Sequence, residues 1–572
     1  MQTRTLNGRP SNDHRRSFMA DFETTTNPDD CRVWVWGTLD LDDDSRFDYG
    51  INIDSFFEFC SVSAKVVYFH NLAFDGMFIL YRLLVEGFHF RDDRFLKPKS
   101  YTCLISDDGK FYTLTVRWGN GNRTEFRDSL KKLPMTVDRI GKAYRTGFTK
   151  GEIDYHADRP VGYQPTDVEL DYLYRDLVIV AKALMIQFDE GMRGLTIGSD
   201  SLTDYKATLR GEFNSLFPSF SIGMDSEIRK AYKGGWTYCN PRFQGREVGS
   251  GNVYDVNSLY PHVMDSKPLP FGYPRYVAGE PVYGDGFDLA IMSVTVTAKI
   301  KPDKLPCIQI KGTPRFVDTE YLTELDEPTN LTCTDVDWAL WNDHYDIDVV
   351  AFNGSYMFQS ATGLFAEYIA KWCKIKAEST GGLREIAKLH LNSLYGKFAT
   401  NPDVTGKYPA LENDRVVLKS GESKTRNPIY TPMGVFITAY ARDITIRAAQ
   451  ANFDRFAYAD TDSLHLLGDD VPTGVEIDPV RMGAWKHELR FDNALYMRPK
   501  AYSERVNRGS LYHRKGFTGH DYTTRIAGLP LSVSRKLTFK DLRDGATFHG
   551  KLTPKRVPGG VVLADTTFTL KF

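Results

Sequence analysis

Residues 458–466 read YADTDSLHL, which places Asp460 and Asp462 one residue apart between two short apolar runs. The apolar residues favour strands, and Asp and Thr are common in turns, so this stretch predicts a strand–turn–strand hairpin. Residues two apart in an extended strand point to the same face. The two carboxylates would then repel one another unless the turn separates them or a cation lies between them. An isolated DTD is most often a solvated turn, so its meaning depends on the rest of the chain.

The length and composition indicate a multidomain protein. A chain of 572 residues is too long for one hydrophobic core and predicts three to five domains. It contains no apolar run of about 18 residues, so we expect no membrane span and no membrane partner. Its seven cysteines are scattered without a CxxC pair, which argues against a zinc module or a disulfide framework. This cysteine usage fits the reducing cytoplasm.

The charge is unevenly distributed along the chain. The net charge of −2 does not by itself suggest a nucleic-acid-binding protein. Residues 500–572, however, carry 14 Lys and Arg against 5 Asp and Glu, a net charge of +9, which leaves −11 on the preceding 499 residues. A basic C-terminal part suits a polyanion, and an acidic remainder suits metal-binding carboxylates.

The first part of the chain alternates strand and helix patterns. RSFMADFETTT predicts a strand that ends at acidic residues, and AKVVYFHNLAFDGMFILYRLLVEG predicts a strand, a short loop and a helix. PTDVELDYLYRD begins a helix capped by Thr166 or Asp167. This alternation over roughly the first 195 residues predicts an α/β domain.

The remaining chain divides into five stretches. GNVYDVNSLYPHV predicts a strand that runs into a turn or helix at Pro261, and residues 267–363 predict short β runs with few long helices. Residues 364–399 predict two helices broken at Gly381 and Gly382. We expect a hairpin-like excursion over 400–430, followed by a helix. The last 45 residues predict short strands with a loop.

One group of carboxylates lies in the α/β part. Asp21 and Glu23 share one face of the first strand, and Asp75 lies at a strand–helix junction. Tyr172 and Asp176, four residues apart, share one face of a helix. Four carboxylates and a tyrosine could hold two divalent cations about 4 Å apart and orient a water for phosphodiester hydrolysis. The alternative is that each acid is a helix cap or a surface residue.

A second group consists of Asp255, in YDVNSLYP, and the two aspartates of the opening stretch. All three fall at strand ends or turns. Carboxylates that hold two magnesium ions are what nucleotidyl transfer requires, and oxygen ligands suit magnesium or manganese better than zinc. Bound cations would also offset the repulsion between Asp460 and Asp462.

Between these acids in the sequence lies a helix with a polar stripe, formed by Arg384, Lys388, Asn392 and Tyr395. Its cations could grip the triphosphate of an incoming nucleotide, and Tyr395 could lie against the base. The alternative is an amphipathic helix with a solvated basic face.

The sequence motifs of this chain, taken together, resemble those of a known family. DFETTT, YFHNLAFDG and YLYRD resemble the three exonuclease motifs of proofreading DNA polymerases. YKGG, DVNSLYP, KLHLNSLYGKFATNPD, TPMGVF, YADTDS and KAY resemble the palm and fingers motifs of family B DNA polymerases. Their order and spacing are similar to those of the protein-primed bacteriophage branch. The resemblance runs from about residue 17 to the end, which leaves an N-terminal extension before it.

The resemblance implies a multidomain α/β and α+β fold, in which an RNase H-like 3′→5′ exonuclease domain precedes a right-hand polymerase domain with two insertions. The implied parts are the exonuclease domain (1–196), the palm (197–266 and 431–526), insertion 1 (267–363), the fingers (364–399), insertion 2 (400–430) and the thumb (527–572). Insertion 1 would contact a terminal protein. Insertion 2 would help encircle DNA and support processivity and strand displacement.

The resemblance also implies roles for individual residues. The implied metal ligands are Asp21, Glu23, Asp75 and Asp176 in the exonuclease, with Tyr172 and Lys150 as catalytic helpers, and Asp255, Val256 and Asp462 in the polymerase, with Asp460 as a supporting acid. The implied nucleotide contacts are Tyr260, Lys376, Arg384, Lys388, Asn392 and Tyr395, among which Tyr260 would exclude a ribose 2′-hydroxyl. The implied DNA contacts are His70, Asn71, Phe74, Ser129, Leu130, Tyr232, Gly234, Gly235, Lys500 and Tyr502. Position 384 departs from the family, where Lys is usual.

These features predict a DNA-directed DNA polymerase with proofreading, primed by a protein hydroxyl or a DNA 3′ end. It would use two Mg²⁺ per active site, which Mn²⁺ could replace. Its expected partners are primer–template and single-stranded DNA, deoxynucleoside triphosphates and a terminal protein, and it would act as a monomer in a host bacterial cytoplasm. One alternative is an exonuclease whose polymerase half only binds DNA. Another is a non-catalytic DNA-binding relative, which predicts loss of the site acids. An RNA polymerase is disfavoured by Tyr260.

Overall fold

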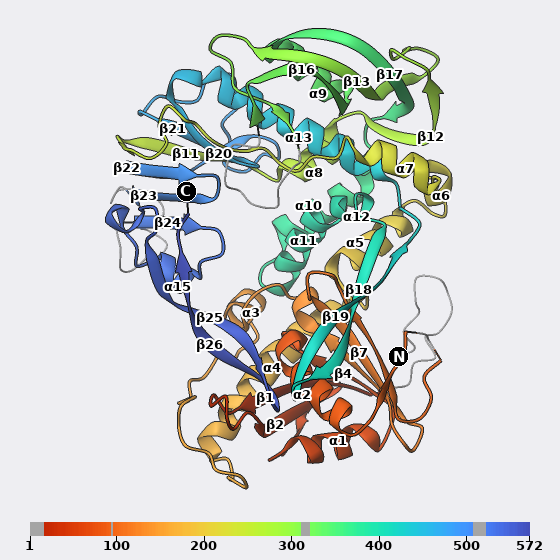
Figure 1. The fold of residues 1–572 in the computed structure, drawn as a ribbon, viewed down its shortest axis with the longest axis vertical. Helices are drawn as coiled ribbons and strands as arrows, with labels where there is room; N and C mark the ends of the chain where they lie inside the picture. The colour runs from red at the N-terminus through yellow and green to blue at the C-terminus, as the bar shows by residue number, and fades with distance from the viewer. Residues whose placement is uncertain (1–15, 93–94, 311–320, 507–521, 572) are drawn as a thin grey trace.

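The computed structural model describes residues 16–92, 95–310, 321–506 and 522–571. The extension over residues 1–15 lies outside the described part. Figure 1 shows the N-terminal α/β unit at one end of the molecule and, at the other, the sheet formed by the predicted insertion 1 (267–363). Short helices and two long β-hairpins lie between these ends. No helix of the described residues is long and apolar enough to cross a membrane.

The N-terminal unit is built on a mixed eight-stranded sheet of order β3-β2-β1-β4-β8-β7-β6-β5. Its strands are β1 (Arg16–Thr24), β2 (Val33–Asp40), β3 (Asp43–Gly50), β4 (Lys65–Phe69), β5 (His89–Phe90), β6 (Ser100–Ile105), β7 (Phe111–Arg117) and β8 (Arg123–Asp128). The central strands β1, β4 and β8 run parallel, and every residue of β2 and β4 is buried. Near-continuous apolar strands of this kind are typical of a sheet covered on both faces.

Helices flank this sheet: α1 (Ile53–Ser61), α2 (Leu72–Val85), η1 (Ser129–Lys131), α3 (Val137–Tyr144) and α4 (Asp167–Asp189). Of the two predicted caps of α4, Thr166 is the one used. Its side chain accepts from the Glu169 backbone, and the Glu169 carboxylate accepts from the Thr166 N–H at 2.9 Å, a reciprocal capping box. The α/β prediction for this region is confirmed.

A second sheet has the order β24-β23-β22-β11-β21-β20-β9, with β10 paired to β22. Its strands are β9 (Thr237–Cys239), β10 (Glu247–Val248), β11 (Gly251–Val256), β20 (Phe456–Asp460), β21 (Ser463–Leu467), β22 (Trp485–Arg498), β23 (Ala501–Val506) and β24 (Tyr522–Ile526). The accompanying helices are α5 (Ile197–Thr208), α6 (Phe213–Leu216), α7 (Ile222–Arg229), α8 (Leu259–Ser266), α13 (Thr431–Ala451) and η2 (Phe453–Arg455). The opening stretch is indeed a hairpin, formed by β20 and β21.

Insertion 1 forms a four-stranded sheet of order β12-β17-β13-β16. Its elements are β12 (Leu269–Val277), β13 (Phe287–Ile300), β14 (Ile308–Gln309), β15 (Tyr321–Leu322), β16 (Glu324–Thr334), α9 (Asp335–His344) and β17 (Tyr345–Ala361). The expectation of short β runs was wrong here, because β13 has 14 residues and β17 has 17. Interspersed Gly and Asp broke the sequence pattern, whereas pairing on both edges of β13 and β17 keeps the strands continuous.

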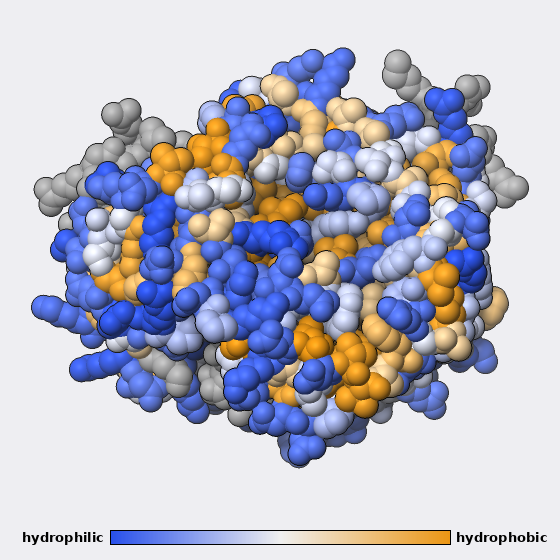
Figure 2. Space-filling model, turned by 90° about the horizontal axis from the view of Figure 1, so that it is seen from above, coloured by the Kyte–Doolittle hydropathy of each residue, from blue (hydrophilic) through white to orange (hydrophobic). Residues whose placement is uncertain are grey.

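The surface of insertion 1 exposes several large side chains. Tyr273 and Tyr276 are each 56% exposed, and Tyr283 is 52% exposed. Figure 2, which looks down on the end of the molecule that carries β13, β16 and β17, shows apolar patches among hydrophilic residues.

The predicted pair of helices in the fingers region is confirmed as α10 (Ala366–Glu378) and α11 (Gly382–Ser393), followed by the short α12 (Tyr395–Phe398). Gly381 breaks the pair with φ of +60°. Gly382 lets α11 approach the N-terminal unit, because a Cβ at this position would lie 2.9 Å from the Tyr144 ring.

Two hairpins reach back to the N-terminal unit (Figure 1). The first, β18 (Asp403–Glu412) and β19 (Arg415–Thr425), confirms the predicted excursion. The C-terminal part contains α15 (Leu531–Ser534), η3 (Phe539–Asp541), β25 (Thr547–Val557) and β26 (Gly560–Thr569). Short strands were expected there, but β25 and β26 form one long hairpin of 11 and 10 residues.

Candidate active sites

The first site gathers the predicted exonuclease acids from three elements. Asp21 and Glu23 project from β1, Asp75 from α2, and Asp176 from α4. All but Asp21 are at least nine-tenths buried. Gly37 on β2, paired with Asp21, leaves room for α4, because a Cβ there would lie 2.8 Å from Leu173.

Burial and mutual repulsion control the charge of this site. Burial, followed by the charge of Asp176, raises the pKa of Asp21 to about 7. Burial, followed by the charge of Asp21, also raises the pKa of Glu23 and of Asp75. One oxygen each of Asp75 and Asp176 is buried without a hydrogen-bond partner. Such orphaned acceptors are what a bound cation would satisfy.

The donor atoms of this site suit a metal ion by their chemistry. Within the described residues, no three His, Cys, Asp or Glu side chains already stand in metal-holding geometry. Lys150 forms an ion pair with Asp176 and also donates to the Tyr172 hydroxyl at 3.0 Å. The all-oxygen set suits Mg²⁺ or Mn²⁺, and Lys150 supplies the nearby positive charge in this structure.

The structure brings both predicted helpers to the acids and adds another residue. The hydroxyls of Tyr155 and Tyr172 lie 2.7 Å apart. Burial, followed by the charge of Glu23, raises the pKa of Tyr172, so its phenol stays protonated. Sequence reasoning missed Tyr155, because it lies in a segment without regular structure and carries no spacing signal.

The predicted single-strand contacts line the same end of the sheet. His70 lies 3.0 Å from the Ser129 hydroxyl. The backbone N–H groups of Asn71 and Leu130 both donate to one oxygen of Asp128, at 3.1 and 3.0 Å. Asp128, which was not predicted from the sequence, thus joins the backbone at Asn71 to the backbone at Leu130. Phe74, partly buried, lies 5.8 Å from the Phe78 ring on the face of α2.

The second site lies where β11 meets the β20–β21 hairpin. Asp255 is opposite Ser463 on β21, and the Val256 N–H donates to the Asp462 carbonyl at 2.9 Å. Burial, followed by the charge of Asp462, raises the pKa of Asp255 to about 7. Burial also raises the pKa of Asp462. The structure therefore places this predicted pair side by side.

Asp460 faces a different partner. Its two carboxylate oxygens lie 2.7 and 2.8 Å from the Lys500 ammonium, and Thr237 donates to it at 3.0 Å. Thr461 and Asp462 form the hairpin turn, with a φ of +64° at Thr461 that separates the two aspartates. The positive charge that offsets Asp460 in this structure is therefore the Lys500 ammonium.

Three of the predicted nucleotide residues, Tyr260, Lys376 and Tyr395, lie near this site. The Tyr260 and Tyr395 rings stack at 4.1 Å with an interplanar angle of 19°. Lys376 lies 3.2 Å from the Ser258 hydroxyl. Burial lowers the pKa of Lys376. Cys373 opposes this shift, and the charges of Arg384, Lys388 and Lys486 add to it. Several cations therefore converge here.

Two predicted cations are engaged within the chain. Arg384 donates to the Lys376 carbonyl, and Lys388 lies 2.5 Å from the Glu385 carboxylate. Asn392 is exposed, and Tyr395 lies just beyond the end of α11. Lys486 was missed by sequence reasoning. It is opposite Asp255 on β22, a neighbour that only the sheet register reveals.

The segment Tyr232–Gly235 packs against the hairpin turn. A Cβ at Gly235 would lie 2.7 Å from the Thr461 side chain, and the Thr461 N–H donates to the Trp236 carbonyl at 2.7 Å. Arg442, also missed from the sequence, donates to the carbonyls of Lys233 and Gly234 at 2.8 and 3.1 Å. Arg442 is itself held by a buried ion pair with Asp337 of insertion 1.

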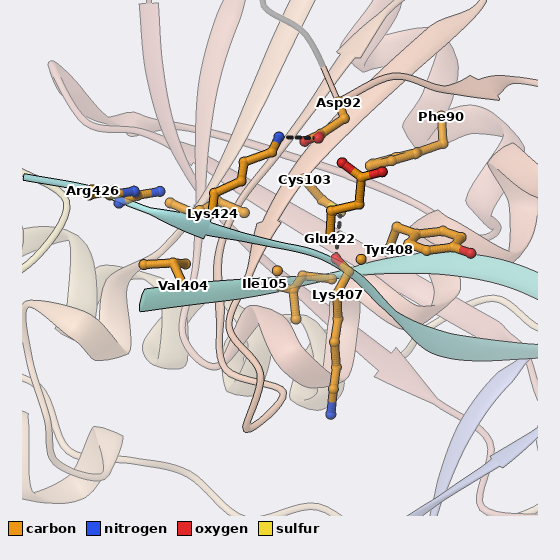
Figure 3. Close-up of a pocket in the computed structure, with 13 residues that line it drawn as sticks. Phe90, Asp92, Cys103, Ile105, Val404, Lys407, Tyr408, Glu422, Lys424 and Arg426 are labelled. Atoms are coloured by element: carbon orange, nitrogen blue, oxygen red, sulfur yellow. Dashed lines mark hydrogen bonds and ion pairs between the residues drawn. The ribbon is translucent and has the colours of Figure 1, made fainter. Parts of the chain in front are cut away.

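The β18–β19 hairpin lies on the edge of the N-terminal sheet and leaves a pocket of about 300 Å³ (Figure 3). The Phe90 and Tyr408 rings stack at 5.6 Å on one side of it. Lys424 reaches Asp92 across the junction, as Figure 3 shows, but both side chains are more than half exposed. Such an exposed ion pair contributes little, so the apolar contacts hold the hairpin.

With this geometry established, the chain can be compared with known proteins. The family of type B DNA polymerases, organellar and viral, matches residues 60–473. The chain belongs to this family. Among type B relatives, the DNA polymerase of Bacillus phage phi29 is 42% identical over 97% of this chain and 99% of its own length. The DNA polymerase of Streptococcus phage Cp-1 is 30% identical over 97% of this chain and 98% of its own.

Solved type B structures are also similar. The orthorhombic crystal form of phi29 DNA polymerase matches with a TM-score of 0.93 and 40% identity, over 97% of this chain and all of that one. Phi29 DNA polymerase with primer–template DNA and incoming nucleotides matches with a TM-score of 0.91 and 41% identity over the same shares. The predicted fold class of this type B polymerase is thereby confirmed.

Proposed function

We propose that this protein is a DNA-directed DNA polymerase with a 3′→5′ proofreading exonuclease. The observation that carries the proposal is that Asp255, near the end of β11, and Asp462, in the adjoining turn of the β20–β21 hairpin, lie side by side in a chain of the type B family. Both site acids are present, which speaks against a non-catalytic DNA-binding relative. The second candidate is an exonuclease whose polymerase half only binds DNA.

In the polymerase site, Asp255, Asp462 and the Val256 carbonyl would hold Mg²⁺, which Mn²⁺ could replace. When bound, such ions lower the pKa of the attacking 3′-hydroxyl and neutralise the leaving pyrophosphate. The chain's own cations, centred on Lys376, bind the triphosphate and orient its α-phosphate for in-line attack. Tyr260 lies under the sugar and excludes a 2′-hydroxyl, and Lys500 and Tyr502 hold the primer end.

In the exonuclease site, the four carboxylates would hold the divalent ions and orient a water toward the terminal phosphodiester. Tyr172 stays protonated and donates to the substrate or water, and Lys150 balances the negative charge. Phe74 stacks on a base of the single strand, while His70 and Ser129 position its backbone.

We further propose protein-primed initiation and processive strand displacement in a host bacterial cytoplasm. The exposed tyrosines of insertion 1 support a protein partner, a terminal protein that presents the priming hydroxyl. The hairpin of insertion 2, docked on the N-terminal unit, supports encirclement of DNA by a single polymerase monomer. Primer–template DNA and incoming nucleotides are bound by the phi29 relative of known structure.

One gel tests the two activities. A primer labelled at its 5′ end and annealed to a longer template is incubated with Mg²⁺, with or without the four deoxynucleotides. We expect extension with nucleotides and shortening without them. Asp462→Ala should abolish only extension, and Asp21→Ala should abolish only shortening, because the two acid groups are built around different sheets.

Shortening alone, unchanged in Asp462→Ala, would reject the polymerase and leave the exonuclease candidate. If neither reaction occurs with a DNA primer, a candidate terminal protein is added with labelled nucleotide. Label transferred to that protein supports strict protein priming, and no transfer supports a binding-only relative.

A further inference from the structure

A buried polar cluster lies within the second sheet and begins at His465, three residues after Asp462. The Glu504 carboxylate on β23 accepts from the Tyr496 hydroxyl at 3.0 Å and lies 2.6 Å from Nδ1 of His465. All three side chains are almost fully buried, among the apolar residues of this sheet. None of them reaches the site acids, so the proposed mechanism does not use them.

The cluster joins strands that the sheet does not join. His465 belongs to β21 of the hairpin that presents Asp462, whereas Glu504 belongs to β23. In the sheet order, β11 and β22 lie between these two strands. Backbone hydrogen bonds therefore cannot tie β21 directly to β23, and the contact of His465 with Glu504 does so through side chains.

The same two parts of the sheet are linked again at the site itself. The Lys500 N–H donates to the Tyr458 hydroxyl at 2.9 Å, and the Lys500 side chain pairs with Asp460. Lys500 adopts φ of +60°, a left-handed conformation that is strained for a residue with a side chain. Such a conformation persists only where its surroundings hold it in place.

Aromatic rings connect the buried cluster with these links. Tyr458 stacks on Tyr496 at 5.5 Å and lies 4.9 Å from the Tyr502 ring. Tyr502 in turn contacts the His465 ring edge-on at 5.2 Å. A shift of His465 or Tyr496 would therefore move the residues that hold Lys500 and Tyr502.

We propose that Glu504 is a positioning residue for primer binding. Held by His465 and Tyr496, it fixes β23, with Tyr502 on the strand and Lys500 just before it, against the β20–β21 hairpin. This inference rests on the primer role proposed above for Lys500 and Tyr502. Asp255 and Asp462 should stay in place without Glu504. Its loss should therefore weaken primer binding more than it slows nucleotide addition.

The test compares KM for primer–template and kcat of nucleotide addition in Glu504→Leu, Tyr496→Phe and Glu504→Gln. Glu504→Leu removes the acceptor that His465 and Tyr496 share and leaves them only their mutual 3.3 Å contact, so we expect it to raise KM by about ten-fold. Tyr496→Phe removes one donor with little change of shape, so it should raise KM by a smaller factor even if the leucine variant fails to fold. Glu504→Gln keeps the accepting oxygen and should restore most of the binding.

The matched control is Ser503→Ala. Ser503 is fully buried on the neighbouring position of β23, and its hydroxyl lies 2.7 Å from that of Thr524. It should lower the melting temperature and leave KM unchanged. If Tyr496→Phe and Glu504→Leu behave in the same way, the cluster is merely structural and the inference is wrong.

Lys500→Ala separates the inference from the proposed function. A raised KM in this variant with unchanged KM in the cluster variants overturns only the role of Glu504. An unchanged KM in Lys500→Ala overturns the primer role itself, and the inference with it. Degradation of single-stranded DNA should stay at the wild-type rate in the cluster variants, because the proposed exonuclease acids are built around another sheet.

Discussion

At the scale of single residues, two aspartates one position apart have opposite surroundings. Asp460 is neutralised by Lys500, whereas Asp462 is half-buried beside Asp255, whose pKa it helps to raise. The turn residue Thr461, at positive φ, produces this separation. The pattern DTD therefore combines one acid in an ion pair with one half-buried acid, and only the second is proposed to hold a metal ion.

The stack of Tyr260 on Tyr395 leads to a prediction about sugar selection. Tyr260→Val removes the ring that would lie under the sugar, so the clash with a 2′-hydroxyl is lost. We expect discrimination against ribonucleotides to fall by about 10- to 100-fold. The measurement is the ratio of kcat/KM for dCTP and CTP on one template.

Tyr260→Phe is the control, because it keeps the ring and loses only the hydroxyl. It should retain most of the discrimination. If the valine variant rejects CTP as well as the wild type does, Tyr260 is not the residue that excludes the 2′-hydroxyl.

At the scale of elements, the sequence predicts local structure well where one chemical pattern is continuous. The hairpin around Asp460, the capped helix α4 and the helix break at Gly381 were all foreseen. The lengths of β17 and β25 were not, because long strands with exposed polar residues gain their continuity from partners far away in the sequence.

Contacts between residues far apart in the sequence also limit the prediction of the site residues. The acids were predicted because motif order marks them. Lys486 and Asp128 were not, because they become neighbours of the sites only through sheet register and loop contacts. The side-chain contacts of Glu504 were also beyond the sequence, since they cross two intervening strands.

The packing of α11 against α10 predicts a pH effect. His390 on α11 is buried, stacks on Trp372 at 3.8 Å and lies 3.2 Å from the Tyr368 hydroxyl. Burial lowers its pKa from 6.5 to about 3. Below pH 6.5 the unfolded chain binds a proton that the folded chain does not, so stability is lost as the pH falls toward 3.

Between pH 7.5 and 5 this histidine should cost about 2 kcal/mol of folding free energy. His390→Gln should remove that part of the pH dependence, at some cost in stability at pH 7.5 from the lost stack. Thermal unfolding at both pH values measures the effect, with the exposed His89→Gln as control. An equal drop in the wild type and His390→Gln would contradict the assignment.

At the scale of the whole molecule, both long hairpins end on the same helix of the N-terminal unit. Tyr81 of α2 donates to Asp414 at the tip of the β18–β19 hairpin, at 3.0 Å. At the tip of the β25–β26 hairpin, Gly560 lies so close to α2 that a Cβ would be 2.5 Å from the Phe78 ring. Because α2 also carries Asp75, the proposed DNA enclosure and the proposed exonuclease site share one element.

Gly559 makes the docking of the C-terminal hairpin testable. A Cβ at this position would lie 2.0 Å from the Cys31 carbonyl oxygen, so Gly559→Ala cannot dock without displacing the tip. We expect several-fold shorter products on a long template in the presence of trap DNA, because an open enclosure lets the enzyme dissociate. Extension of a short template by a few nucleotides should change little.

Positive φ alone also strains an alanine, and Gly545→Ala controls for this strain. Gly545 has φ of +76°, close to the +90° of Gly559, but a Cβ there would meet nothing within 4 Å. Both variants should lose a similar amount of stability from the backbone, and only Gly559→Ala should shorten the products. Equal product lengths in the two variants would show that contact of this hairpin with Cys31 does not contribute to processivity. A larger defect of Gly559→Ala at high salt would be expected as well, since salt weakens the remaining electrostatic hold on DNA.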